Sequence, residues 1–284
     1  MDPHYSSHLT VRLARESDQP AIVRLCRRAV SRYDYVIRIL HTVINRGGLF
    51  LAWDGAELAG MTNFDWCMDG SGWLSMARTD PAWRRRGVAI KLQGKIAAYA
   101  RRRSVRTLRL WITSGNTPSV KAAGRVGFRQ ICEAAHISCR LKTHHTHRKI
   151  PPSMPTTSRL QSLLKSSYVA RTRGYIGYKR HFMEFRKPLL AKLCNQGDLY
   201  VTDHTALLVS GPDRLFRVPQ CSLAILEGPM AESLNRAKEI AQGMRAQMLS
   251  SYIPYNPYQI SVAKRLGFTR SSWGKHCLVY EKKI

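Results

Sequence analysis

The stretch Trp83-Arg84-Arg85-Arg86-Gly87-Val88-Ala89 decides the interpretation of this 284-residue chain. Residues 73–77 before it have a strand pattern, and residues 90–103 after it have the spacing of an amphipathic helix. A glycine turn that opens a helix leaves backbone N–H groups without intrahelical partners, and the helix dipole favours an anion there. Three arginines add charge-assisted donors. The stretch therefore predicts a binding site for a phosphate or pyrophosphate group.

The surrounding patterns predict a mixed α/β sheet. Before the stretch, two helix patterns that begin near Ser17 and Asp34 follow the first strand pattern, and turn sequences separate the later strands. The strand patterns before the stretch cover residues 9–15, 49–53, 58–68 and 73–78. After the helix at 90–103 come a strand at 105–113, a short helix at 117–126 and a β segment at 128–142. This order is an antiparallel meander followed by a crossover helix.

With these elements placed, the first half of the chain resembles the GNAT acetyltransferases. The pattern Thr79-x-Pro81-x-Trp83-Arg84-x-x-Gly87-x-Ala89 is similar to the R/Q-x-x-G-x-G/A loop of that family, and Asn116 precedes Phe128 of Gly127-Phe128 by twelve residues. The resemblance covers residues 9–142. It implies that the loop holds the pyrophosphate of acetyl-CoA and that the cofactor pairs with the end of the preceding strand. The cofactor-binding residues that it implies are Ala77, Arg78, Thr79, Arg84, Arg85, Arg86, Gly87, Val88, Ala89 and Asn116.

Two of these assignments have plain structural alternatives. Arg84–Arg86 also fits a solvated basic turn, and Asn116 also fits a simple helix N-cap.

The catalytic groups are harder to assign than the cofactor site. Transfer of acetyl to an amine requires loss of an amine proton and polarisation of the thioester carbonyl. Many family members have a tyrosine seven residues after the asparagine, where this sequence has Ala123, and some have a glutamate where it has Trp111. The remaining catalytic candidates are Asp65 as a base and Ser75 as a relay through water. Backbone amides near Ala77 would polarise the thioester.

The charge of the chain is unusual. Lys and Arg number 46 against 18 Asp and Glu, which gives a formal net charge of +28. Residues 1–142 hold 24 basic and 10 acidic residues, and residues 143–284 hold 22 and 8, so each half carries +14. Such an excess favours a polyanionic partner, for which RNA, DNA and a ribosome or other ribonucleoprotein remain open.

Other features exclude classes of site. The seven cysteines show no C-x-x-C spacing, and His144-His145-Thr146-His147 lies in a basic connector, so no metal site is predicted. No apolar run is long enough to span a membrane, and residues 1–4 lack the apolar core of a signal peptide. We expect a cytoplasmic protein with reduced thiols.

The second half contains an internal repeat. The segment from Asn256 to Gly267-Phe268 aligns with the segment from Asn116 to Gly127-Phe128 at an offset of 140 residues, which predicts a second GNAT-like unit. The loop that would match the cofactor loop, residues 226–230, has Glu227 and Pro229 in place of arginines, and Pro229 removes an amide donor. The second unit is therefore predicted to be degenerate and unable to bind acetyl-CoA. An unrelated α/β domain with a chance match is the alternative.

These observations combine into one prediction. The fold is a tandem GNAT-like acyl-CoA N-acyltransferase fold, with a cofactor domain at 1–142, a linker at 143–157 and a degenerate domain at 158–284 that completes an intrachain pseudo-dimer. The activity is acetyl-CoA-dependent N-acetyl transfer to an amine acceptor, with a nucleic-acid- or ribosome-associated acceptor or a small amino acid both open. The alternative is a non-catalytic basic RNA- or ribosome-binding protein that retains the fold.

Overall fold

A computed structural model describes residues 8–142, 149–215, 218–270 and 276–284. The chain forms two compact units. The first contains the described residues up to Leu110 together with Lys121–Phe128 and Glu281–Ile284, and the second contains Trp111–Val120 and Arg129–Tyr280. Each unit therefore includes a segment from the other half of the sequence. The predicted domains 1–142 and 158–284, which follow single cuts in the sequence, remain a prediction.

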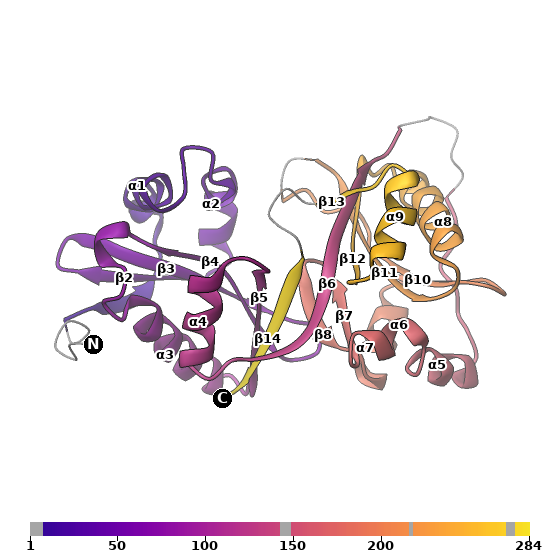
Figure 1. The fold of residues 1–284 in the computed structure, drawn as a ribbon, viewed down its shortest axis with the longest axis horizontal. Coiled ribbons are helices and arrows are strands. Elements are labelled where there is room, and N and C mark those ends of the chain that lie inside the picture. The colour runs from indigo at the N-terminus through magenta and orange to yellow at the C-terminus, as the bar shows by residue number, and fades with distance from the viewer. Residues whose placement is uncertain (1–7, 143–148, 216–217, 271–275) are drawn as a thin grey trace. The chain divides into compact units, whose positions relative to one another are not determined.

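The first unit contains a meander of antiparallel strands that ends in a parallel pair. Strand β1 pairs with β2, β2 with β3 and β3 with β4, all antiparallel, and β5 runs parallel to β4. Figure 1 shows α1 and α2 on one side of these strands and α3 on the other. The strands are β1 (Thr10–Leu13), β2 (Leu49–Asp54), β3 (Glu57–Trp66), β4 (Gly72–Thr79) and β5 (Thr107–Thr113). The helices are α1 (Gln19–Ala29), α2 (Tyr35–Asn45), α3 (Val88–Arg101) and α4 (Thr117–Arg125), with short 3-10 turns at Glu16–Asp18 and Pro81–Trp83.

Local sequence explains these elements. Asp34 caps α2 because its Oδ1 accepts the N–H of Val36 at 3.2 Å. Gly47 (φ +71°) follows the helix in the left-handed region that glycine favours. Phe50 and Phe64 both contact Tyr99 of α3 edge-on, with ring centroids 5.1 and 5.8 Å apart. These contacts fix α3 against the strands.

The second unit has a sheet in the order β6-β12-β11-β10-β9, with β11 and β12 parallel. Strand β13 pairs with β6, and β7 pairs with β12 and β8. The strands are β6 (Arg129–Arg140), β7 (Tyr175–Tyr178), β8 (His181–Glu184), β9 (Leu199–Val201), β10 (Ala206–Val209), β11 (Gln220–Glu227), β12 (Met248–Pro254) and β13 (Thr269–Arg270), and β14 (Cys277–Lys283) runs from this unit into the first. The helices are α5 (Thr157–Leu163), α6 (Ser167–Arg171), α7 (Lys187–Asn195), α8 (Met230–Gly243) and α9 (Pro257–Arg265).

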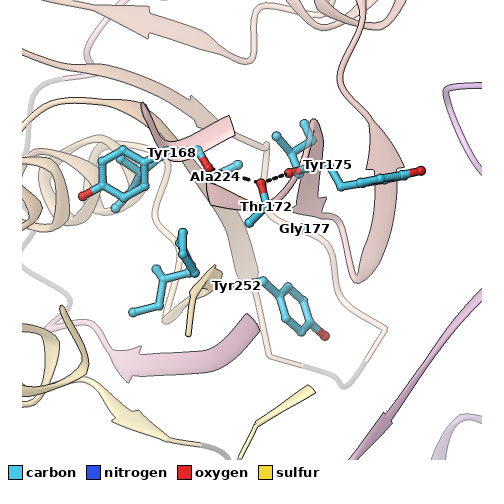
Figure 2. A pocket seen from close by; sticks show the side chains of 10 residues that line it. Tyr168, Thr172, Tyr175, Gly177, Ala224 and Tyr252 are labelled. Atoms are coloured by element: carbon cyan, nitrogen blue, oxygen red, sulfur yellow. Dashed lines mark hydrogen bonds between the residues drawn. The ribbon is translucent and has the colours of Figure 1, made fainter. Parts of the chain in front are cut away.

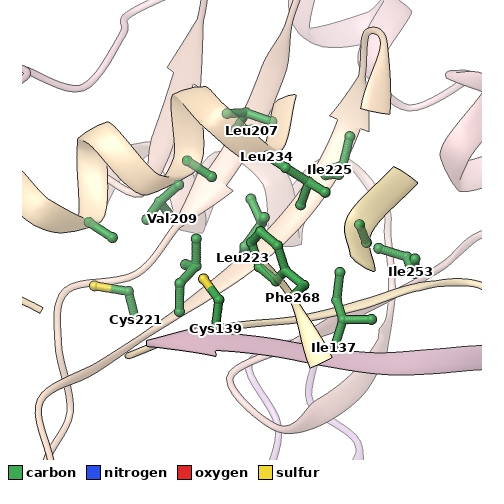
Figure 3. Packing of buried hydrophobic residues seen from close by; sticks show 14 of the residues in the cluster. Ile137, Cys139, Leu207, Val209, Cys221, Leu223, Ile225, Leu234, Ile253 and Phe268 are labelled. Carbon is green, nitrogen blue, oxygen red and sulfur yellow. The ribbon is translucent and has the colours of Figure 1, made fainter. Parts of the chain in front are cut away.

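Strand β6 supplies part of the core of this unit. Figure 3 shows Ile137 and Cys139 of β6 packed with Leu223, Leu234 and Phe268 from β11, α8 and the turn after α9. The packing agrees with the register, in which Ile137 lies opposite Ser251 and Cys139 opposite Leu249 of β12. A segment that the sequence assigns to the first half thus contributes a strand to the core of the second unit.

The predicted mixed α/β fold is confirmed. The sequence pattern of residues 158–170 predicts one helix, but this stretch forms two helices, because Ser166 caps a new helix by accepting the N–H of Val169. The sequence does not predict the hairpin β7–β8, which lies between this region and α7. No described helix has the length and apolar character needed to cross a membrane. All seven cysteines are free thiols. The histidine run at 144–147 and residues 1–4 lie outside the described residues.

Candidate functional site

The loop between β4 and α3 is anchored by Asp80. Its Oδ1 accepts the N–H of Ala82 at 3.0 Å, its Oδ2 lies 2.7 Å from the guanidinium of Arg28, and its own N–H donates to the carbonyl of Ala59 at 3.0 Å. The side chain is buried. Asp80 therefore connects the start of the loop to both α1 and β3.

The rest of the loop presents backbone N–H groups at the start of α3. Arg85 (φ +65°) and Gly87 (φ +78°) adopt left-handed conformations, and α3 begins at Val88. Within the part of the chain that the structure describes, the N–H groups of Val88, Ala89 and Ile90 have no acceptor, and the N–H of Lys91 is the first to bond, to Gly87 O at 3.0 Å. These donors and the positive end of the helix dipole fit an anion.

The three arginines of the loop are exposed and leave the loop strongly positive. Arg84 Nη2 lies 3.5 Å from the carbonyl of Ala29, and Arg86 stacks over the ring of Trp83 with its guanidinium carbon 5.3 Å from the centroid. The alternative of a solvated basic turn fits their side chains taken alone. The backbone donors beside them are what distinguishes this loop from such a turn.

Tight packing fixes the first residue of α3. Val88 is buried, and its Cγ1 lies 2.7 Å from the position that a Cβ on Gly60 of β3 would occupy. The carbonyl oxygen of Arg78 lies 2.9 Å from the same position. The absence of a side chain at Gly60 allows the helix to begin directly on the sheet.

Strand β4 stops pairing with β5 close to the point where its register with β3 shifts. Its ladder with β5 consists of two pairs, Gly72 with Leu108 and Trp73 with Arg109. The register with β3 shifts between Met61 and Asn63, and Met76 has φ +55°. This is a β-bulge, which redirects a strand and is common beside active sites. The backbone of β4 beyond Trp73 is consequently outside the β5 ladder.

Arg78 uses its side chain for a structural contact. Its Nε and Nη2 donate to the carboxylate of Asp34 at 2.8 and 2.9 Å, and the Asp34 side chain is fully buried. Burial alone would raise the pKa of Asp34, but the hydrogen bonds and charge of Arg78 outweigh it and lower that pKa. Arg78 therefore ties α2 to β4, and any contact with a cofactor would come from its backbone.

The two catalytic candidates lie together on one face of the sheet. Asn63 Nδ2 donates to Asp65 Oδ2 at 2.7 Å and to Ser75 Oγ at 3.5 Å. Asn63 and Ser75 are direct partners across β3 and β4, and Asp65 is two residues along the same strand. Sequence reasoning missed Asn63, although the alternation of Asn63 and Asp65 along one strand is a signal for a shared face.

Asn116 has the geometry of a helix cap. Its Oδ1 accepts the N–H of Ser119 at 3.2 Å, and Asn256 accepts the N–H of Gln259 at 3.1 Å in the same way. Both asparagines precede helices of nine residues. Asn116 belongs to the second compact unit, whereas the other predicted cofactor residues belong to the first.

The ends of these two helices also correspond. Gly127 and Gly267 have φ of +87° and +80°, and the N–H groups of Phe128 and Phe268 donate to Ala123 and Ala263, both at 3.0 Å. The sequence repeat is thus a repeat of local structure.

The loop after β11, which the sequence repeat predicts to match the β4–α3 loop, contacts its neighbours closely. Both oxygens of Glu227 accept from Arg159, at 3.0 and 2.9 Å. A Cβ on Gly228 (φ +113°) would lie 2.5 Å from the carbonyl oxygen of His204. A proline at position 229 precedes α8.

A small pocket of the second unit lies beside the ends of β11 and β12. Figure 2 shows it lined by residues that include Tyr168, Tyr175, Ala224 and Tyr252, with the Thr172 hydroxyl donating to the carbonyls of Tyr168 and Tyr175. The centre of a water molecule can move within about 20 Å³ of this pocket, so the pocket has room for one water molecule. Strand β7 pairs with Tyr252 at this point and occupies the space beside β12.

The sheet order, the loop and the bulged fourth strand identify the architecture. The fold is that of the GNAT acetyltransferases. Residues 15–128 match the model of the acetyltransferase (GNAT) family. No protein of curated function matches the sequence.

Solved structures agree at the level of the fold. A putative acetyltransferase from Thermoplasma acidophilum is 14% identical with a TM-score of 0.56, and the match covers 98% of this chain and 94% of that one. A putative acetyltransferase from Pyrococcus horikoshii is 14% identical with a TM-score of 0.53, covering 100% and 92%. A putative acetyltransferase from Salmonella typhimurium, solved with its cofactor acetyl-CoA, is 19% identical with a TM-score of 0.38 over 45% of this chain and 84% of that one.

Proposed function

We propose that this protein is an acetyl-CoA-dependent N-acetyltransferase whose first unit binds the cofactor. The observation that carries the proposal is the set of unpaired N–H groups from Val88 to Ile90, which lies beside three exposed arginines. These groups would hold the pyrophosphate of acetyl-CoA. The backbone of Ala77, Arg78 and Thr79, beyond the bulge of β4, would pair with its pantetheine arm.

The proposed chemistry moves two protons. The acceptor ammonium loses one proton to Asp65, directly or through water and Ser75, and the free amine attacks the thioester carbonyl. The new N–C bond converts the carbonyl into a tetrahedral oxyanion, and the collapse of this oxyanion breaks the C–S bond, so that the coenzyme A thiolate leaves with the second amine proton. Backbone amides near Ala77 would stabilise the oxyanion between these steps. The side chain at position 123 is a buried alanine, so no tyrosine acid is available there.

The second unit is proposed to be a degenerate GNAT-like unit. The matching caps and helix ends at Asn116 and Asn256 support the tandem arrangement. The Glu227–Arg159 pair and the closed turn at Gly228 support a loss of cofactor binding. This unit would complete a pseudo-dimer and extend the basic surface.

The acceptor is proposed to be an amine that a polyanion presents, such as one associated with RNA or a ribosome. The support is the net charge of +28. A test is retention of the nuclease-treated protein on heparin, where strong salt-dependent retention is expected. Elution at low salt would contradict the proposal.

One observation favours a second candidate, a non-catalytic basic binding protein. It is the absence of a family tyrosine at Ala123. The decisive experiment combines thermal unfolding in acetyl-CoA with an assay of coenzyme A release over a panel of amines. Stabilisation by acetyl-CoA, about 2.7 kcal/mol at 100 times the dissociation constant, together with amine-dependent release supports the enzyme. Stabilisation without release from any amine supports the binding protein, and no stabilisation overturns the cofactor site.

A further inference from the structure

The strand face that carries Asp65 and Ser75 contains a third polar residue. Asn63 is only 2% exposed. Buried amide side chains normally have hydrogen-bond partners. The Nδ2 group of Asn63 has two protons, and the structure gives it two acceptors, Asp65 Oδ2 at 2.7 Å and Ser75 Oγ at 3.5 Å. One buried amide thus connects both catalytic candidates.

The absence of a side chain at Gly48 and the alternation of side chains along β3 place the Asn63 amide on this face. Its Oδ1 lies 3.2 Å from where a Cβ on Gly48 would be, so the glycine leaves room for the amide group. On the next position of β3, Phe64 points to the opposite face, where it contacts Tyr99 of α3. The amide is therefore enclosed by its own strand pair, with its donors directed along the face that holds Asp65.

The cluster lies where β4 stops pairing with β5 and its register with β3 shifts. Ser75, the partner of Asn63, immediately precedes the bulged residue Met76, and the pairing with β5 ends two residues earlier at Trp73. A polar group here lies on the strand segment whose backbone is proposed to receive the thioester. All of these residues belong to the first compact unit.

We propose that Asn63 is a positioning residue of the acetyltransferase site, an inference that rests on the proposed function. Its amide donates to the ionised carboxylate of Asp65 and holds it beside Ser75. A hydrogen bond to the charged form of an acid favours that form. Asn63 thereby keeps Asp65 ionised and oriented to accept the proton that the acceptor ammonium releases. Ser75 is the second acceptor of the same Asn63 amide group.

The test compares the pH dependence of kcat/KM in three variants. Asn63→Leu removes the donor at nearly constant volume, Asp65→Asn removes the carboxylate, and Thr62→Val is a matched control on the opposite face of β3. Thr62 is also buried, and its hydroxyl bonds only its neighbouring carbonyl, that of Met61. Asn63→Leu is expected to lower kcat/KM about tenfold or more and to move the acidic limb of the profile up by about one pH unit. Thr62→Val is expected to move neither, and acetyl-CoA affinity is expected to stay unchanged in all three.

The outcomes are distinguishable. If the wild-type protein is active and the Asn63→Leu limb stays where it is, the inference is wrong while the proposed function stands. If the limb also moves in the Asp65→Asn background, Asn63 acts through another group and the inference is again wrong. A wild-type protein that acetylates no amine removes the proposed function itself. Should Asn63→Leu fail to fold, Asn63→Ser, which is smaller and loses the reach to Asp65, gives the same pH readout.

Discussion

A methyl group at Gly60 tests whether the start of α3 forms the cofactor cradle. In Gly60→Ala the new Cβ would lie 2.7 Å from Val88 Cγ1 and 2.9 Å from the carbonyl oxygen of Arg78, closer than side chains are normally found. Reaching 3.4 Å requires a movement of about 0.7 Å at Val88, and overpacking of this kind costs about 1–3 kcal/mol. Because the N–H of Val88 is one of the proposed phosphate donors, the shift should weaken coenzyme A binding about tenfold.

The chain provides a matched control and a rescue. Gly94 is an exposed residue of α3, and a Cβ added to it would have no atom within 4 Å, so Gly94→Ala should stabilise the helix by about 0.8 kcal/mol and leave the affinity unchanged. In the double variant Gly60→Ala/Val88→Ala the removed valine methyls make room, and part of the affinity should return. Isothermal titration with coenzyme A and denaturant unfolding measure both quantities. Wild-type affinity in Gly60→Ala, with the helix displaced or not, would refute the assignment of the cradle.

Three further changes test other parts of the structure. Gly87→Glu puts a side chain on a residue whose φ is +78° and places a negative charge in the cradle. Coenzyme A should then no longer raise the melting temperature. Continued stabilisation would mean that the loop is misassigned. Glu227→Arg should leave the acetyl-CoA affinity measured by calorimetry at the wild-type value. It should lower the free energy of unfolding by less than about 1 kcal/mol, because the Glu227–Arg159 pair is partly exposed. A second acetyl-CoA site in this variant would contradict a closed loop. His136 has a pKa lowered to about 4 by burial and then by the charge of Arg180, so the unfolded chain takes up a proton near pH 6.5 that the folded protein does not. Stability should fall by about 2.6 kcal/mol between pH 6.5 and 4. In His136→Phe this loss should be absent from urea unfolding curves, and an equal loss in both proteins would exclude His136 as its cause.

The conformation of the β4–α3 loop was predictable because its signals are local. A glycine at the start of a helix, arginines beside it and a strand before it all lie within about twenty residues, and the structure places each as the sequence indicates. The role of the Arg78 side chain was not predictable, because its partner Asp34 lies 44 residues away and the sequence gives no sign of the contact. Asn63 was missed for a similar reason, since its partner Ser75 is set by the β3–β4 register.

The hairpin β7–β8 was missed because its turn lacks the usual residues. Two-residue hairpin turns with positive φ at both positions favour Asn-Gly, but here Lys179 (φ +49°) and Arg180 (φ +66°) occupy them. Ion pairs of Lys179 with Asp198, at 2.8 Å, and of Arg180 with Asp213, at 2.5 Å, hold the turn instead. Distant partners thus stabilise a conformation that the two turn residues disfavour on their own.

The buried guanidinium of Arg109 limits how far the first unit can fold while the chain is still being translated. It donates to Asp69 at 2.6 Å and to Glu281 at 2.7 Å, and the N–H of Ile284 donates to the carbonyl of Arg106 at 3.0 Å. Glu281 follows Arg109 by 172 residues, which a ribosome needs roughly 10–30 s to translate. During that interval a charge destined for the interior lacks one of its two carboxylates. The unit that contains the β4–α3 loop is therefore the first to begin folding and the last to be completed.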